Sequence, residues 1–201
     1  MKGKFKINDH DACGTGVIFS KNNISSHSII SRALLSLKNM KHRGALSYDG
    51  MTPDGCGILI DLDRNFYQKK LLEEQNHILP NKFAIAFLMV QEGFDHVGVM
   101  SNICSKLGLK ILAKRDLNIN KKILGELAQK SCPRFIQFFL SPKKNNLTND
   151  LEPIYFKIKK YLDNNFCAEK ELYCSSFSET TIVYKGLIHP VFWIQNSQLL
   201  L

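Results

Sequence analysis

The chain has 201 residues, 44% of them hydrophobic, so it can bury a substantial core as one large domain or two small ones. No apolar run approaches the ~18 residues of a membrane span, and no segment has the composition of a disordered region. The net charge of +9 comes mostly from dispersed lysines, with five arginines among the 27 basic residues, and this pattern argues against a nucleic-acid-binding surface.

The first twelve residues change from basic to acidic and contain no apolar stretch, so they do not resemble a secretory signal. We therefore expect a cytoplasmic protein. None of the six cysteines forms a Cys-x-x-Cys pair, and in the cytoplasm they are expected to stay reduced. The sequence predicts neither disulfides nor a structural zinc site.

The first predicted elements are a strand and a helix. Residues 13–19 are largely apolar and rich in β-branched side chains, and polar residues follow them, which predicts a strand. From Ser26 to Met40 apolar residues recur at helical spacing, with the serine at the N-cap position, which predicts an amphipathic helix of about four turns. Gly44 is placed to end this helix in the left-handed conformation.

The rest of the chain alternates apolar runs with stretches of helical periodicity, after a stretch dense in turn formers at 49–55. Strands are predicted at 56–62, 83–90, 110–113 and 135–140. Helices are predicted at 65–75, 94–107, 123–129 and 151–162. The last two apolar runs, 171–175 and 180–184, are predicted to form a hairpin. Long apolar strands mixed with amphipathic helices indicate α/β or α+β layers, and we treat 13–188 as one unit.

Cys13 is the candidate nucleophile. A cysteine at the start of a predicted strand is, by itself, most often a buried packing residue. If the chain were cut before Cys13, however, one residue would carry both a thiol and a free α-amino group. The α-amino group has a reference pKa of about 7.7 to 8.0 and can act as the base that activates the thiol. On this interpretation residues 1–12 are a propeptide.

Several motifs, in a fixed order, carry a family resemblance. They are residues 11–16 (DACGTG), 37–45 (LKNMKHRGA), 49–59 (DGMTPDGCGIL), 124–126 (LGE), 133–134 (PR) and 181–187 (TIVYKGL). In this order and spacing they resemble the glutamine amidotransferase domain of the glutamate synthase large subunit, a class II amidotransferase. The resemblance spans nearly the whole chain up to about residue 188.

The resemblance implies an α+β fold of the N-terminal-nucleophile hydrolase type, an αββα sandwich. It implies that Cys13 attacks the side-chain amide of glutamine and that Arg43, in the His-Arg-Gly motif, supports the site around the nucleophile. On residue type alone, Arg43 could equally satisfy carbonyls at a helix end. We assign no catalytic role to His42, because a packed or hydrogen-bonded histidine is the commoner use of this residue.

The sequence departs from the family pattern in two places. Pro53 stands where the family usually has a glycine before Asp54, and proline fixes φ and removes an N–H donor. The chain also contains no Asn-Gly pair and no arginine after Arg134, whereas the family takes its oxyanion donors and a substrate-binding arginine from a later segment. We therefore expect an incomplete sandwich, with 13–188 as the N-terminal part of the domain and 189–201 as a divergent tail.

Two functions stay open. The chain is either the glutaminase portion of a glutamate synthase, supplying ammonia for glutamate biosynthesis, or a non-catalytic remnant or piece that needs a second polypeptide to complete the site. The partners implied are glutamine and the remaining large and small subunits, with neither nucleic acid nor membrane. No cofactor is expected in this chain, because the FMN and iron–sulfur cluster of a full-length glutamate synthase belong to later regions.

Overall fold

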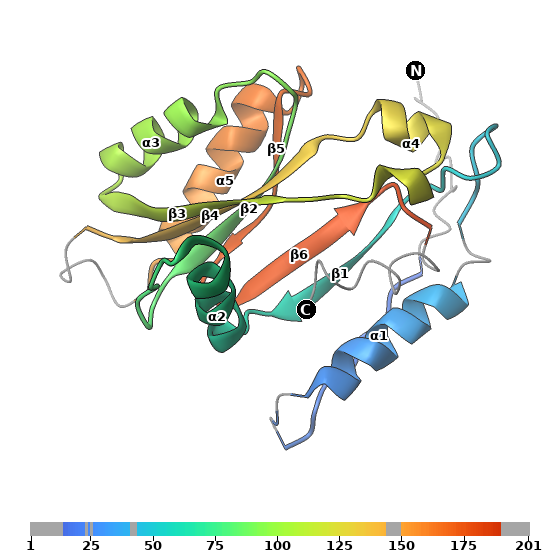
Figure 1. Ribbon diagram of the computed structural model, residues 1–201, viewed down its shortest axis with the longest axis horizontal. Coiled ribbons are helices and arrows are strands. Elements are labelled where there is room, and N and C mark those ends of the chain that lie inside the picture. The colour runs from blue at the N-terminus through green and yellow to red at the C-terminus, as the bar shows by residue number, and fades with distance from the viewer. Residues whose placement is uncertain (1–13, 23, 25, 41–43, 144–149, 190–201) are drawn as a thin grey trace, which may run out of the picture.

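The structure is a computed structural model that describes residues 14–22, 24, 26–40, 44–143 and 150–189. Helices and strands alternate along the chain (Figure 1). The helices are α1 (His27–Asn39), α2 (Arg64–Gln75), α3 (His96–Lys106), the 3₁₀ helix η2 (Lys121–Ile123), α4 (Glu126–Lys130) and α5 (Glu152–Phe166). The strands are β1 (Cys56–Asp61), β2 (Ala84–Val90), β3 (Leu109–Leu117), β4 (Arg134–Pro142), β5 (Leu172–Ser178) and β6 (Thr181–Gly186).

A four-stranded antiparallel sheet forms the centre of the molecule, with its strands in the order β3-β4-β2-β5. Strand β2 is apolar on both faces because both faces are covered, which explains its continuous hydrophobic run. Ala86 and Leu88 belong to the hydrophobic cluster on one face, and Ile85 and Phe87 belong to the cluster on the other. The sheet therefore lies between two cores.

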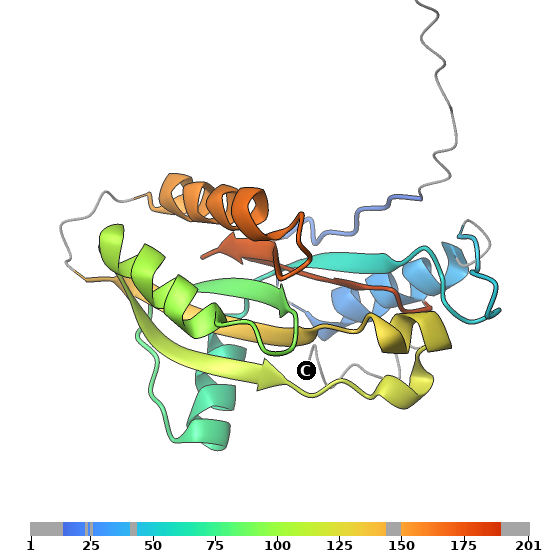
Figure 2. The same ribbon diagram turned by 90° about the horizontal axis from the view of Figure 1, so that it is seen from above.

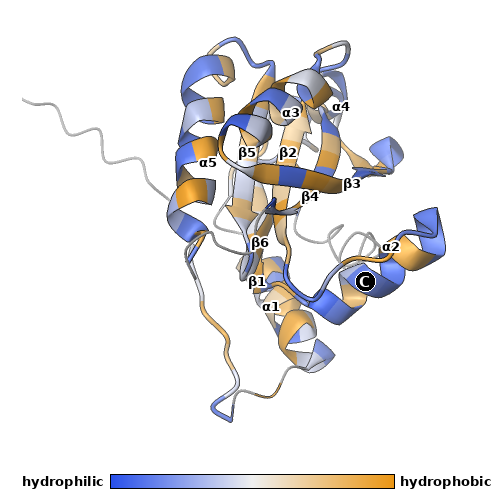
Figure 3. Cartoon of the chain, turned by 90° about the vertical axis from the view of Figure 1, so that its left-hand side faces the viewer, coloured by the Kyte–Doolittle hydropathy of each residue, from blue (hydrophilic) through white to orange (hydrophobic). Residues whose placement is uncertain are grey.

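Helices cover one face of this sheet and a second sheet packs on the other. The first core contains residues of α3 and α5, and both views place these helices on the same side (Figures 1 and 2). The second core contains residues of α1, α2, β1 and β6. Figure 3 shows apolar residues along the strands and polar residues on the outer turns of the helices. The chain thus has the predicted α+β architecture.

Strands β1 and β6 form a separate antiparallel pair, in register from Cys56 opposite Gly186 to Asp61 opposite Thr181. The predicted hairpin of β5 and β6 is wrong, since β5 pairs with β2 whereas β6 pairs with β1. Serine side chains of β5 contact the β6 backbone instead. The Val183 N–H donates to Ser176 Oγ at 3.1 Å, and Ser175 Oγ lies 3.2 Å from the Val183 carbonyl oxygen.

The predicted first strand is wrong for its described part. Residues 14–20 form no strand, and the side chains of Val17 and Phe19 are 82% and 78% exposed. A strand is stabilised only by a partner, and β1 pairs with β6 alone among the described residues. An apolar, β-branched composition therefore did not suffice to form a strand here.

Helix α1 confirms the predicted helix but not its predicted ending. The Ser26 side chain caps it by accepting from the Ser28 N–H, as expected from the sequence. The helix ends at Asn39, before Gly44 is reached, and the amide of Met40 bonds to carbonyls of the last turn. The left-handed ending predicted at Gly44 is therefore wrong.

The other predicted helices and strands are confirmed, with bounds shifted by a few residues. The main difference is β3, predicted at 110–113, which runs from Leu109 to Leu117 because it pairs with β4 over its whole length. Among the helices that the structure describes, none is both long and apolar enough to cross a membrane.

Candidate functional site

Residues 44–55, between α1 and β1, form a compact loop with internal hydrogen bonds. The Ser47 N–H donates to the Thr52 carbonyl at 2.7 Å, and the Asp54 N–H donates to the Ala45 carbonyl at 3.2 Å. The Asp54 carboxylate accepts a further bond from the Ala45 N–H at 3.0 Å. The two ends of the loop are thereby held to each other.

Pro53 fits this loop without losing a hydrogen bond. It forms an isolated antiparallel bridge with Leu46, and the bonds on either side use the Thr52 carbonyl and the Asp54 N–H. The missing N–H of proline is therefore not needed at this position. Pro53 therefore does not disrupt the turn, because the hydrogen bonds of the turn are made by its neighbours Thr52 and Asp54.

Asp49 lies at the tip of the loop and accepts four hydrogen bonds. Its Oδ1 accepts from the backbone N–H groups of Met51 at 3.0 Å and Thr52 at 2.7 Å. Its Oδ2 accepts from the Thr52 hydroxyl at 2.5 Å and from the Leu127 N–H at 3.2 Å. These bonds, with that from the Thr52 hydroxyl the strongest, hold the pKa of Asp49 far below its ordinary value. Asp49 is therefore ionised at neutral pH.

The same turn caps the N-terminus of α4. The Leu127 N–H donates to Asp49, and the Ala128 N–H donates to the Thr52 hydroxyl at 3.3 Å. These are the second and third helical residues, whose N–H groups have no partner within a helix. The N-cap residue, Gly125, cannot supply a side chain, so a segment more than seventy residues earlier in the chain supplies the cap.

Gly125 is required by this close approach. A Cβ atom at this position would lie 2.6 Å from the Thr52 nitrogen and 2.7 Å from Asp49 Oδ2, which is too close for non-bonded atoms. Figures 1 and 2 both show the loop beside α4. The loop and the Leu124-Gly125-Glu126 segment therefore form one unit, which we call the 49/125 anchor, comprising Asp49, Thr52 and Gly125.

The C-terminal end of the loop, where β1 begins, packs against the end of β6. Gly55 has a φ of +108°, and a Cβ atom there would lie 3.1 Å from the Gly186 carbonyl oxygen. The next residue, Cys56, donates its thiol to the Ile188 carbonyl at 3.1 Å. Glycine therefore serves both the backbone conformation and the close contact at this position.

A cavity of about 250 Å³ lies between the two sheets, beside α4 and the end of β6. Its wall is almost entirely apolar and includes Phe87, Leu117, Phe135 and Leu187. No residue of the 44–55 loop lines it. A cavity of this kind holds apolar groups and lacks the polar partners needed to bind the charged head group of an amino acid.

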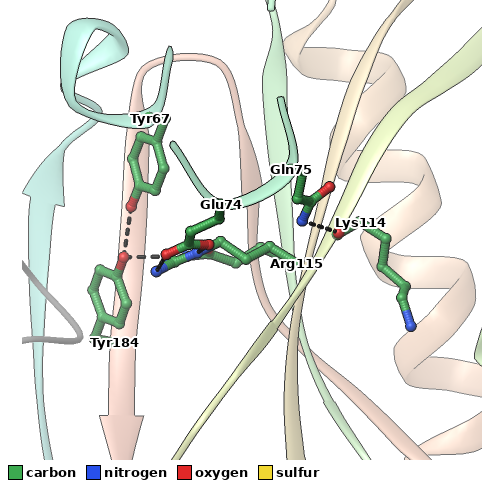
Figure 4. A network of polar contacts seen from close by, with 7 residues as sticks. Tyr67, Glu74, Gln75, Lys114, Arg115 and Tyr184 are labelled. Carbon is green, nitrogen blue, oxygen red and sulfur yellow. Dashed lines mark hydrogen bonds and ion pairs between the residues drawn. The ribbon is translucent and has the colours of Figure 1, made fainter. Parts of the chain in front are cut away.

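A buried polar network ties α2 to both sheets (Figure 4). The Arg115 guanidinium donates to both carboxylate oxygens of Glu74, at 2.7 and 2.8 Å, and to Gln137 Oε1 at 3.3 Å. Gln137 in turn donates to the Tyr184 hydroxyl, which bonds to the Tyr67 hydroxyl. Burial raises the pKa of both tyrosines, so they stay protonated. The network is satisfied within the protein and supports packing.

Comparison with known proteins assigns the family. Residues 13–195 match the family model described as class-II glutamine amidotransferases. The chain belongs to this family. It is 30% identical to the ferredoxin-dependent glutamate synthase 1 of Arabidopsis thaliana, 32% to the NADPH glutamate synthase large chain of Bacillus subtilis and 33% to the ferredoxin-dependent glutamate synthase of Pyropia yezoensis. Each alignment covers 90% of this chain but 12% of the relative, so the chain spans about an eighth of their length.

Both site residues predicted for this amidotransferase domain, Cys13 and Arg43, lie outside the described residues, as does His42. The structure therefore does not test whether Cys13 and Arg43 meet. It does place their neighbours: Gly14 is exposed, and Ala45, two residues after Arg43, is bonded to Asp54. The predictions for Cys13 and Arg43 stay predictions.

Sequence reasoning missed the anchoring role of Asp49 and Thr52. Their segment was predicted as a turn and, like Gly125, as part of the family resemblance, but neither side chain was given a role. The one available signal was that residues 49–59 and 124–126, which are far apart in sequence, both match the amidotransferase pattern.

Neither a metal site nor a disulfide is seen in the described part of the amidotransferase chain. Within those ranges no group of three or more His, Cys, Asp or Glu side chains could hold a metal ion. The five described cysteines form no disulfide with one another, and burial raises the pKa of Cys104 and Cys174 to about 12. These two thiols are therefore protonated and poorly suited to act as nucleophiles.

Proposed function

We propose that the chain is the glutaminase portion of a glutamate synthase and that Cys13 is its nucleophile. The observation that carries this proposal is the family match, which begins at Cys13 and extends to residue 195. A match that starts at this cysteine supports removal of residues 1–12 as a propeptide. The α-amino group of Cys13 would then be free to act as the base.

The proposed reaction proceeds in two steps. The α-amino group takes the proton of the Cys13 thiol, and the thiolate attacks the side-chain carbonyl carbon of glutamine. The C–N bond breaks, and the leaving nitrogen takes a proton from the α-ammonium group to depart as ammonia, leaving a γ-glutamyl thioester. Water then attacks the thioester, the C–S bond breaks, and glutamate and the free thiol are released.

Arg43 is proposed to support the site around Cys13. What supports this proposal is the family match, which includes the His-Arg-Gly motif at 42–44. Ala45 is bonded to Asp54 through both its N–H and its carbonyl group, so the chain just after Arg43 is fixed. Glutamine is the proposed substrate, and the ammonia would serve glutamate biosynthesis in a full-length enzyme.

The finer fold proposed is the N-terminal-nucleophile hydrolase sandwich, with helices outside two facing sheets. Three of the four layers of such a sandwich have counterparts among the described elements, which support this proposal. They are one helix layer, the four-stranded sheet and the β1–β6 pair. We propose 13–188 as the N-terminal part of the amidotransferase domain and 189–201 as a divergent tail, of which residues 189–195 still fall within the family match. We propose a cytoplasmic location, in keeping with the five described cysteines, which form no disulfide with one another.

A second candidate function is that of a piece completed by another polypeptide, such as the remainder of a large subunit with its small subunit. Within the described ranges β1 pairs on one side only, and Leu59 on this strand is 62% exposed. Val17 and Phe19 are more exposed still. Apolar side chains beside an unpaired strand edge are favourable sites for strand addition.

One experiment separates the candidates. Purified chain, with its N-terminus checked by intact mass, is incubated with glutamine, and ammonia and glutamate are measured. In parallel it is treated with an electrophilic glutamine analogue, and the modified cysteine is located by peptide mass spectrometry. We expect equal amounts of the two products and a label on Cys13, both lost in Cys13→Ala and kept in the control Cys167→Ala.

The outcomes point to different conclusions. A labelled Cys13 without turnover would favour the second candidate, since the nucleophile would be in place but the site incomplete. Neither label nor turnover, in a chain that begins at Cys13, would contradict glutaminase activity of the isolated chain. Labelling that survives Cys13→Ala would contradict the assignment of the nucleophile.

A further inference from the structure

We propose that the cavity between the two sheets is a binding site for a small neutral aromatic molecule of two fused rings, such as an indole. This proposal goes beyond the glutaminase function and does not depend on it. It is carried by the volume of the cavity, by the aromatic rings of its wall and by the hydrogen bonds that already occupy the polar groups of the wall.

The cavity is large for the interior of a protein. Interiors are packed as densely as organic crystals, and few voids in a domain are larger than a water molecule. The space here measures about 250 Å³. An apolar cavity of about 150 Å³ is enough to bind benzene. A molecule of two fused rings therefore fits this volume better than a single ring does.

Three aromatic side chains, Phe87, Phe135 and Tyr184, line the cavity. The ring centroid of Phe87 lies 6.0 Å from that of Phe135 and 5.1 Å from that of Tyr184, and both pairs of rings are tilted. Phe87 and Tyr184 are buried, whereas Leu187 in the same wall is exposed. The inner end of the cavity is thus aromatic, and aromatic rings favour a further ring in an offset or edge-on arrangement.

The polar groups of the wall are already bonded within the protein. The Tyr184 hydroxyl belongs to the buried network of Figure 4. The Ser131 hydroxyl donates to the Leu127 carbonyl at 2.9 Å. The Lys185 ammonium group donates to the Tyr173 hydroxyl at 2.5 Å. A charged ligand would lose its hydration here without gaining a partner, so the ligand that fits is neutral and largely apolar.

Cys132 provides a reporter for occupation of the cavity. It lines the cavity and is half-buried, and burial raises the pKa of its thiol. A ligand in the cavity should cover this thiol and slow its modification. Cys167 is also half-buried, but it lies at the end of α5 and does not line the cavity. It therefore serves as the control within the same molecule.

The test measures how fast N-ethylmaleimide modifies Cys132 and Cys167 in the unchanged chain, by peptide mass spectrometry, with and without indole. For a dissociation constant of about 0.5 mM, indole at about 5 mM should slow modification of Cys132 about tenfold. Modification of Cys167 should stay within about twofold. In urea titrations the same indole should raise the ratio of folded to unfolded chain about tenfold, because it binds the folded chain alone. Benzamidine, a charged ring, should have neither effect.

Two variants test where the ligand binds. Ala128 is buried in α4 and lines the cavity, so Ala128→Leu should fill part of the space and abolish the protection of Cys132. Ile123→Phe should have the same effect from η2, so the test does not depend on one variant folding. Ala168→Leu, at an exposed position after α5, is the matched control and should keep the protection.

Each contrary outcome overturns the proposal. Indole that neither slows the modification of Cys132 nor stabilises the chain would show that the cavity takes no such ligand. Equal slowing at Cys132 and Cys167, or an equal effect of benzamidine, would show non-specific association with the surface. Protection that survives in both filling variants would place the ligand outside the cavity. None of these results bears on the labelling of Cys13, so this proposal and the glutaminase function fail separately.

Discussion

Gly125 is the residue whose side chain, if it had one, would collide with the 44–55 loop. In Gly125→Ala the new methyl group would lie 2.6 Å from a backbone nitrogen, which cannot move as a flexible side chain would. Overpacking of this kind typically costs about 1–3 kcal/mol. We expect the free energy of unfolding to fall by that amount in urea titrations. Gly16→Ala, where no atom lies within 4 Å, should have little effect, and equal effects would contradict the anchor.

The roles of the single residues in the 49/125 anchor were only partly predictable from sequence. Asp49 and Thr52 belong to a stretch dense in turn formers, and this local signal correctly predicted the turn. Their bonds to Leu127 and Ala128 join positions 78 and 76 residues apart, and no local pattern reports such a distance. Chemistry at Cys13 was predicted because an N-terminal cysteine has a recognisable mechanism, whereas the contact of Asp49 with α4 depends on the fold.

Helix α2 is docked on β3 by the Glu74–Arg115 ion pair. The two hydrogen bonds from Arg115 hold the pKa of the Glu74 carboxyl below its ordinary value of 4.5. The unfolded chain therefore binds this proton more readily, so the stabilisation is present above about pH 4.5 and is lost as the pH falls through the lower folded value. In Glu74→Gln, unfolding in urea should be easier at neutral pH, and the difference from the unchanged chain should shrink in acid.

The neighbouring Glu73 provides the control for this prediction. It pairs with Lys69 at 3.8 Å on the surface of the same helix, with about half of its side chain exposed. Exposed pairs of this kind contribute little to stability. Glu73→Gln should therefore differ little from the unchanged chain at either pH. A constant effect of Glu74→Gln at all pH values would instead indicate lost packing rather than a lost ion pair.

At the scale of elements, the periodicity of apolar residues predicted where most helices and strands lie. It did not predict which strands pair with each other. Most helices and strands were found from their apolar patterns, including the continuous run of β2. Apart from the ending of α1, the two failures are the described part of the strand predicted at 13–19 and the β5–β6 hairpin, and both concern strand partners. A strand is defined by the neighbour it bonds to, and β5 and β6 each bond to strands distant in sequence.

At the scale of the whole molecule, the family was predictable because its motifs are local and ordered, and the match over 13–195 bears this out. The arrangement that joins the motifs was not predictable in the same way. Loop 44–55, α4 and the end of β6 come from three separate parts of the sequence and meet only in the fold. Their meeting brings matched segments that lie far apart in the chain into contact.

The two cores should unfold together because they share the central strands. β2 and β4 each contribute alternate residues to both cores, so neither core can open while the other keeps its sheet. Leu71→Ala in one core and Ile158→Ala in the other remove fully buried side chains, and each should lower the free energy of unfolding by about 2–5 kcal/mol. Leu72→Ala, on the exposed side of α2, should have a much smaller effect.

The measurement is unfolding in urea followed by two probes, far-ultraviolet circular dichroism for the helices and near-ultraviolet dichroism for the packed tyrosines. A cooperative chain gives coincident transitions for both probes in every variant. Separate transitions in Ile158→Ala would mean that α3 and α5 detach while the β1–β6 side stays folded. The β1–β6 side would then be an independent folding unit, and the 44–55 loop would keep its geometry without the helical layer.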